Sequence, residues 1–181
     1  NIGLGCTWNP ELIRSASEVV AREVAATGID WTFAPCIAVV RNERWGRTYE
    51  GFGETPEIQK IMARESVIGL QGTDLSHKES ILACAKHFVG DGGTMDGKDQ
   101  GNTVLTETEL RAIHMPGYID AIEAGVSGSS QTPVGLLQNS DAHDFVKACG
   151  KFKRAIARAI VNHNHFKIWI SLCPDAVQAQ R

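Results

Sequence analysis

The sequence predicts an α/β fold in which helices alternate with the parallel strands of a sheet. Three segments with helix signals and two short apolar segments rich in β-forming residues follow one another in the order helix, strand, helix, strand, helix. A polar cluster comes directly after each apolar segment, where the loops of right-handed βα units lie. The pattern is typical of both an open doubly wound sheet and a closed barrel.

The first helix is expected to begin at Pro10 and to end near Gly28. Asn9 can cap the free N–H groups, and a proline at the first helical position loses no intrahelical hydrogen bond. Apolar residues recur on one face, which predicts an amphipathic helix: Leu12, Ile13, Ala16, Val19, Val20 and Val24. Residues 31–40 are rich in β-formers without sustained alternation, as expected of a strand covered on both faces.

A second helix is predicted over residues 56–70, where apolar residues again recur at helical spacing. Gly69 and Gly72 lie where this helix should stop. Residues 81–88 are apolar and short, and they form the next predicted buried strand.

The segment after the second strand contains a loop and then a third helix. Residues 90–102 are too rich in glycine for a regular element. Thr106 and Glu109 have the spacing of a capping box, which predicts a helix start. Pro116 should kink or divide this helix.

Composition places the chain among ordinary globular proteins. Its 181 residues fit one domain with a sizeable core. With 43% hydrophobic residues, 22% charged residues and a formal net charge of -3, nothing indicates a nucleic acid or an acidic polymer as partner, and a neutral ligand such as a sugar is compatible. The sequence contains no run of about 18 apolar residues, so it predicts no membrane-spanning helix. Residues 1–5 lack the pattern of a signal peptide.

The cysteines predict neither a metal site nor a disulfide framework. They lack a CxxC pair and a histidine at zinc-ligand spacing, and their odd number argues against complete pairing: positions 6, 36, 84, 149 and 173. Cys36 and Cys84 lie in apolar runs and are expected to be small buried hydrophobes. His163 and His165 have a spacing that a metal could use on a strand, but on a helix they point apart, so no metal site is predicted there.

Arg47 is the first candidate binding residue. Its guanidinium is a rigid fork of donors for sugar hydroxyls or a carboxylate, and Trp45 and Tyr49 offer faces for a pyranose ring. The alternative is a structural salt bridge, for which Glu50 or Glu54 could supply the carboxylate.

Lys86 and His87 are the second candidate group. They end an apolar strand, where the desolvation of two polar side chains needs a reason. Both can donate hydrogen bonds to adjacent sugar hydroxyls. In the alternative reading, Lys86 pairs with a neighbouring carboxylate and His87 is a satisfied core histidine.

Three stretches of sequence together resemble the N-terminal barrel domain of glycoside hydrolase family 3, of the β-glucosidase and exo-β-glucanase type. Residues 30–36 read Asp-Trp-Thr-Phe-Ala-Pro-Cys, residues 44–50 read Arg-Trp-Gly-Arg-Thr-Tyr-Glu, and residues 85–93 read Ala-Lys-His-Phe-Val-Gly-Asp-Gly-Gly. The resemblance covers residues 1–127 and implies an incomplete (β/α)8 TIM-like barrel. Residues 128–181 form a divergent basic tail, a foreign or frame-shifted end or a continuation of the barrel.

The resemblance also implies which residues contact the sugar. It assigns Arg47, Lys86 and His87 to the innermost glucose subsite. The N-acetylglucosaminidase branch of the family has Pro and His where this chain has Val89 and Asp91, so the chain looks like the glucosidase branch. Gln100 stands where related exoglucanases tend to have Glu, which leaves a carboxylate partner for His87 unassigned.

The implied reaction is the retaining hydrolysis of terminal β-D-glucosyl linkages in oligosaccharides or β-glucans, without a cofactor. Retention needs a nucleophile and an acid/base carboxyl about 5 to 5.5 Å apart. The family's nucleophile is an Asp after a later strand, for which Asp175 is the nearest candidate. Its acid/base comes from a second domain, so this chain alone is expected to be inactive. Family membership further suggests a periplasmic or secreted protein.

Two rival functions stay open. The first is a carbohydrate-binding remnant that no longer cleaves its ligand. The second is a flavodoxin-like domain with an unrelated ligand, which the absence of a glycine-rich phosphate loop at a helix start disfavours. The basic residues of the tail, Lys147 to Lys167, are most simply a solvated face, and neither a membrane nor a nucleic acid is the expected partner.

Overall fold

The computed structural model describes residues 1–126 and 128–131. All of them fall within the first of two compact units of the chain, Asn1–Leu136. The second unit lies outside the described residues, and with it Asp175 and most of the predicted basic tail.

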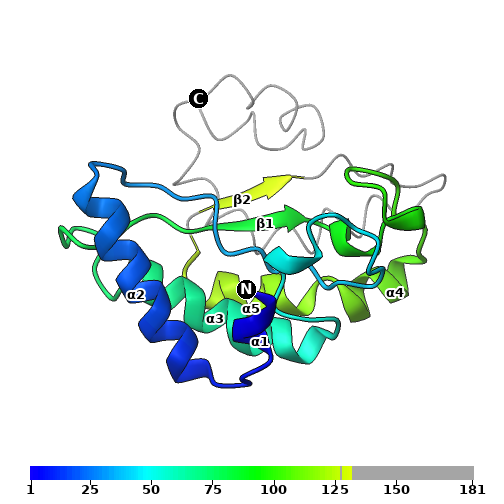
Figure 1. The fold of residues 1–181 in the computed structure, drawn as a ribbon, viewed down its shortest axis with the longest axis horizontal. Helices are drawn as coiled ribbons and strands as arrows, with labels where there is room; N and C mark the ends of the chain where they lie inside the picture. The colour runs from blue at the N-terminus through cyan, green and yellow to red at the C-terminus, as the bar shows by residue number, and fades with distance from the viewer. Residues whose placement is uncertain (127, 132–181) are drawn as a thin grey trace, which may run out of the picture. The chain divides into compact units, whose positions relative to one another are not determined.

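The described elements alternate between helical and extended segments (Figure 1). The helices are α1 (Ile2–Gly5), α2 (Pro10–Ala26), α3 (Pro56–Gln71), α4 (Glu107–Ile113) and α5 (Pro116–Glu123). Three short 3₁₀ turns among the described residues are η1 (Thr48–Glu50), η2 (Asp91–Gly93) and η3 (Met95–Gly97). The strands are β1 (Cys84–Phe88) and β2 (Gly128–Gln131).

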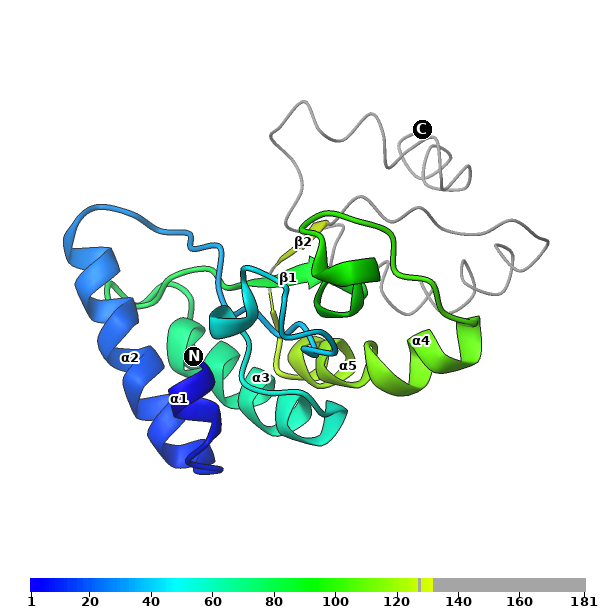
Figure 2. The ribbon, with the colours of Figure 1, turned by 45° about the vertical axis from the view of Figure 1, so that its right-hand side comes forward.

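Strands β1 and β2 are parallel neighbours, with Cys84 opposite Gly128 and a shift of register after Ala85. The chain between them contains α4 and α5, so this part of the molecule is a βαβ unit. Helices α3 and α5 lie together on one side of the two strands (Figures 1 and 2). The predicted α/β class is therefore confirmed, whereas the described residues form two paired strands and no closed barrel.

The prediction of a regular strand over residues 31–40 is wrong, because the segment is extended but forms only isolated bridges. The segment runs parallel to β1 through isolated bridges, Trp31 to Leu82 and Cys36 to Lys86. Pro35 has no N–H to donate to a ladder. Beyond it the backbone turns to other partners: the Val40 amide donates to Gly53, and that of Arg41 to Gly92. The predicted burial is confirmed for residues 36–40.

The helix ends follow the predicted local signals. The Asn9 side chain accepts a hydrogen bond of 3.1 Å from the Leu12 amide. Thr106 and Glu109 form both bonds of a capping box at the start of α4. Pro116 divides the predicted third helix, because it occupies the first turn of the separate helix α5. The glycine-rich loop is not wholly irregular, since it contains η2 and η3.

Helix α2 is covered over a narrower stripe than its sequence predicts. Ile13 and Ala21 are buried, but Leu12, Val19 and Val20 are exposed. The helix crosses α3 closely at Gly69, where a Cβ atom would lie 2.5 Å from the Arg14 carbonyl oxygen. The packing of α2 among the described residues is thus mainly against α3.

The buried side chain of Gln59 connects helix α3 to the segments before and after the candidate site loop. The Gln59 amide donates to the carbonyl oxygens of Ala38 (3.1 Å) and Gly53 (2.9 Å). Cys36 and Cys84 are buried, as predicted. Among the described helices, none has the length and hydropathy that a membrane crossing requires.

Candidate functional site

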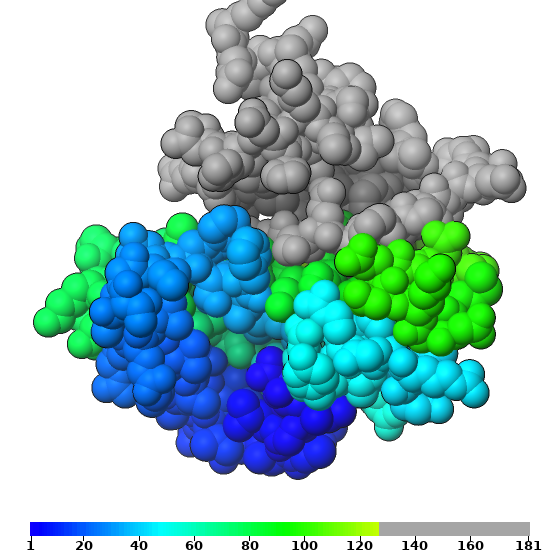
Figure 3. All heavy atoms as spheres, turned by 45° about the horizontal axis from the view of Figure 1, so that its top comes forward, coloured from blue at the N-terminus to red at the C-terminus, as the bar shows by residue number. Residues whose placement is uncertain are grey.

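The 3₁₀ turn η1 carries Glu50 and directly follows Arg47, two residues of the candidate site. Thr48 donates to the Trp45 carbonyl oxygen through its amide (3.0 Å) and its hydroxyl (2.7 Å). Asn1 donates to the carbonyl oxygens of Tyr49 (3.0 Å) and Glu50 (2.9 Å). Figure 3 shows this contact as the dark blue N-terminal residues lying against the cyan segment. The backbone of the turn is therefore anchored from two directions.

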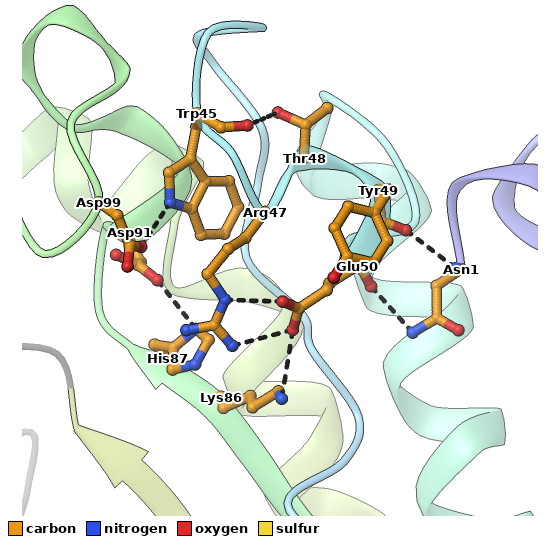
Figure 4. A network of polar contacts seen from close by, with 10 residues as sticks. All are labelled: Asn1, Trp45, Arg47, Thr48, Tyr49, Glu50, Lys86, His87, Asp91 and Asp99. Atoms are coloured by element: carbon orange, nitrogen blue, oxygen red, sulfur yellow. Dashed lines mark hydrogen bonds and ion pairs between the residues drawn. The ribbon is translucent and has the colours of Figure 1, made fainter.

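Glu50 lies between the two predicted cationic binding residues (Figure 4). Its Oε1 atom accepts from Arg47 Nε (2.7 Å) and its Oε2 atom from Arg47 Nη2 (2.9 Å). The same Oε2 atom lies 3.2 Å from Lys86 Nζ. Arg47 directly precedes the turn η1 and Lys86 lies in β1, so one carboxylate joins two segments that are distant in sequence.

The electrostatics of this trio follow from its geometry. The hydrogen bonds from Arg47 lower the pKa of Glu50 to about 2, against the opposing effect of burial, and Lys86 adds to the lowering. The hydrogen bond to Glu50 in turn raises the pKa of Arg47 above its ordinary value. Glu50 and Arg47 are therefore both charged at neutral pH.

His87 has its own carboxylate partner. Its Nδ1 atom lies 2.9 Å from Oδ2 of Asp91, which is deeply buried at the start of η2. The two groups lie within ion-pair distance, although the geometry at Nδ1 is not that of a hydrogen bond. In Figure 4, His87, Lys86 and the Arg47 guanidinium lie close together at one end of β1.

The loop after β1 packs against the loop that carries Arg47 through a hydrogen bond and a close backbone contact. The Trp45 indole donates to Asp99 (3.0 Å). Gly97 has φ +67, and a Cβ atom there would lie 2.6 Å from the Trp45 amide nitrogen, so only glycine fits. Because Trp45 is buried, it offers no face to a sugar, contrary to expectation, whereas Tyr49 is exposed.

Other reactive groups of the described chain are poorly suited to chemistry here. Burial raises the pKa of the Cys36 thiol to about 11, and that of Cys84 likewise to about 11. Neither thiol is a thiolate at neutral pH. No group of three metal-binding side chains occurs among the described residues.

The structure thus joins the predicted residues Arg47 and Lys86 through Glu50, and His87 follows Lys86 on the same strand. The salt-bridge alternative and the binding role are compatible, because a carboxylate can hold a cation that also faces a ligand. Asp91 was not predicted as the partner of His87. Its only sequence signal is a spacing of four residues, which carries little information in a loop.

Comparison with known proteins gives a family match over most of the chain. The family described as "Glycosyl hydrolase family 3 N terminal domain" matches residues 1–130, which include every residue of the candidate site described above. This range agrees with the resemblance noted over residues 1–127.

Two curated relatives are β-glucosidases by name. A periplasmic β-glucosidase of Salmonella typhimurium is 32% identical over 142 residues, covering 78% of this chain and 18% of the relative. A lysosomal β-glucosidase of Dictyostelium discoideum is 30% identical over 152 residues, covering 81% of this chain and 18% of the relative. The chain therefore spans less than a fifth of the length of either protein.

Two solved structures share the described fold. The exo-1,3/1,4-β-glucanase of a Pseudoalteromonas species is 49% identical with a TM-score of 0.69, over 73% of this chain and 17% of that one. The β-glucosidase of Listeria innocua, solved in complex with glucose, is 33% identical with a TM-score of 0.72, over 74% of this chain and 19% of that one.

Proposed function

Because the chain belongs to glycoside hydrolase family 3, we propose that it supplies part of the glucose subsite of an enzyme that hydrolyses terminal β-D-glucosyl linkages in oligosaccharides or β-glucans. The observation that carries this proposal is the Arg47–Glu50–Lys86 trio beside His87. It gathers three donor side chains of two segments at the end of one strand.

These donors have capacity left for a ligand. Glu50 accepts from the Nε and Nη2 atoms of Arg47, and within residues 1–126 and 128–131 the Nη1 atom has no hydrogen-bond partner. Within the same residues Lys86 Nζ makes one ion pair, and an ammonium group has three N–H donors. Charged donors of this kind bind hydroxyl oxygens more strongly than neutral donors do. The glucose complex of the Listeria relative supports a sugar as the ligand.

The catalytic carboxyl groups of a retaining mechanism are proposed to lie elsewhere. Both oxygens of Glu50 are held by cations, and Asp91 is buried against His87. Neither is free to attack an anomeric carbon or to protonate a leaving group. We keep Asp175, outside the described residues, as the candidate nucleophile and assign the acid/base to a second domain. No step in this scheme requires a cofactor.

The architecture and location are proposed on the same basis. The βαβ unit and the parallel run of residues 30–37 beside β1 are what part of a (β/α)8 barrel contains. We propose that residues 1–127 are such a part. The periplasmic names of two relatives favour a periplasmic or secreted protein.

A chimeric enzyme tests the proposal. Residues 1–130 would replace the matching segment of the Pseudoalteromonas exo-glucanase, and turnover of an aryl β-glucoside would be measured. Turnover should fall at least about tenfold in Arg47→Ala, since a hydrogen bond from a charged group is worth about 1.5 to 3 kcal/mol. The matched control is Arg44→Ala, an exposed arginine of the same loop, which should retain activity.

Two outcomes would change the proposal. An active chimera that is indifferent to Arg47→Ala would remove this arginine from the subsite. A folded chimera that binds glucose without turnover would favour the alternative function, a carbohydrate-binding remnant.

A further inference from the structure

The trio at the site has an unequal balance of charge. Arg47 and Lys86 contribute two positive charges and Glu50 one negative charge, which leaves a net charge of +1. The three side chains are 28%, 18% and 19% exposed, respectively, so water screens them only in part.

The two cations are close because they share one oxygen atom. Arg47 Nη2 lies 2.9 Å and Lys86 Nζ 3.2 Å from Oε2 of Glu50. The two nitrogen atoms are consequently no more than about 6 Å apart, a range over which like charges repel strongly in a partly buried site. The carboxylate is what makes this spacing favourable.

We propose that Glu50 is a positioning and specificity-determining residue, which fixes the spacing of Arg47 and Lys86 and, by offsetting one of their two charges, weakens the binding of a sugar acid relative to a neutral sugar. This inference rests on the proposed glucose subsite. With Glu50 neutralised, the two cations would carry a net charge of +2 and would attract the carboxylate of a uronic acid. Glu50 itself stays ionised over the whole range in which such enzymes work, because its pKa is about 2.

The carboxylate is not needed to hold the turn that carries it. The backbone of η1 is anchored by Asn1, by the bonds between Thr48 and Trp45, and by the amide of Glu50 donating to Arg47 (2.9 Å). A change confined to the Glu50 carboxylate should therefore leave the fold in place. This separates a role toward the ligand from a merely structural role.

The test compares the binding of D-glucose and D-glucuronate to the full 181-residue chain by ligand-observed NMR at low salt. In Glu50→Gln, the glucose-to-glucuronate affinity ratio should move at least about tenfold toward glucuronate, and this gain should shrink at high salt. Glu54→Gln is the matched control, because Glu54 is an exposed carboxylate four residues away, and its ratio should equal that of wild type.

Two further results complete the test. Glu50→Asp keeps the charge on a shorter side chain, so it should keep the wild-type affinity ratio and bind both sugars more weakly. It also carries the test if Glu50→Gln does not fold, because glucose affinity equal to wild type in Glu50→Asp would overturn the positioning role. An unchanged ratio in folded Glu50→Gln would overturn the specificity role. Absence of glucose binding by wild type would instead contradict the proposed function itself.

Discussion

The Nδ1 atom of His87 lies 2.9 Å from the Oδ2 atom of Asp91, whose side chain is 1% exposed. Gly90, between them, has φ +99, a left-handed conformation that lets the chain fold back directly after β1. The buried carboxylate thus lies directly against the imidazole ring. Asp91 and Glu50 are therefore alike in that each carboxylate lies within ion-pair distance of a predicted binding residue, His87 in one case and Lys86 in the other.

Asp91→Asn should weaken glucose binding by about tenfold. The amide has nearly the same size but can donate as well as accept, so it presents a different group to the His87 ring. Asp96→Asn is the control, because Asp96 is exposed in the same loop. ¹⁵N chemical shifts of the His87 ring would report the tautomer, and shifts identical to wild type in Asp91→Asn would contradict this role.

Lys86→Ala should lower kcat/KM of the chimeric enzyme by at least about tenfold. The change removes one charged donor and leaves the bidentate Arg47–Glu50 pair intact. Steady-state kinetics on an aryl β-glucoside measure the effect. Unchanged kinetics would assign Lys86 to a structural salt bridge alone.

The stabilising effect of Glu50 should depend on pH in a defined direction. Its pKa is lowered from an ordinary value of 4.5 to about 2, so the folded state holds the carboxylate ionised where the unfolded state takes up a proton. The stabilisation is fully present above pH 4.5 and is lost as the pH falls toward 2. Urea unfolding of wild type and Glu50→Gln should show a difference in unfolding free energy that narrows over this interval, and a difference that widens would contradict the ion-pair account.

His114 should weaken the fold in mild acid. It is buried, with no hydrogen-bond partner for either ring nitrogen among the described residues. Burial, assisted by Arg41, lowers its pKa from 6.5 to about 4. Between these values the unfolded chain binds a proton that the folded chain does not, so the unfolding free energy falls as the pH drops from about 6.5 to 4.

Substitution of His114 by Phe removes this titration. Thermal or urea unfolding of His114→Phe should therefore show a shallower loss of stability over the same pH interval. A slope equal to that of wild type would mean that other groups cause the acid sensitivity.

Local signals made much of the fold predictable. The caps at Asn9 and Thr106 and the division at Pro116 depend on a few neighbouring residues, and each occurs as predicted. The irregular pairing of residues 31–40 and the exposure of Val19 and Val20 depend on distant partners, which a single sequence does not specify.

In the candidate site, the sequence singled out the donor side chains more readily than the carboxylates that contact them. Arg47, Lys86 and His87 stand out because charged and polar groups at strand ends need a reason. Glu50 could be named only together with Glu54, because the choice between them depends on the turn η1. Asp91 could not be chosen, since its approach to His87 depends on the backbone of Gly90.

The most direct test of the glucose subsite is a ¹H–¹⁵N NMR titration of the 181-residue chain with D-glucose, observing the Nε–H signal of Arg47 and the ring nitrogens of His87. Both sets of signals should shift together with one affinity, and the shifts should disappear in Lys86→Ala. Signals of Arg47 and His87 that stay unchanged while glucose binds elsewhere, or that do not respond to glucose at all, would contradict a glucose subsite at these residues.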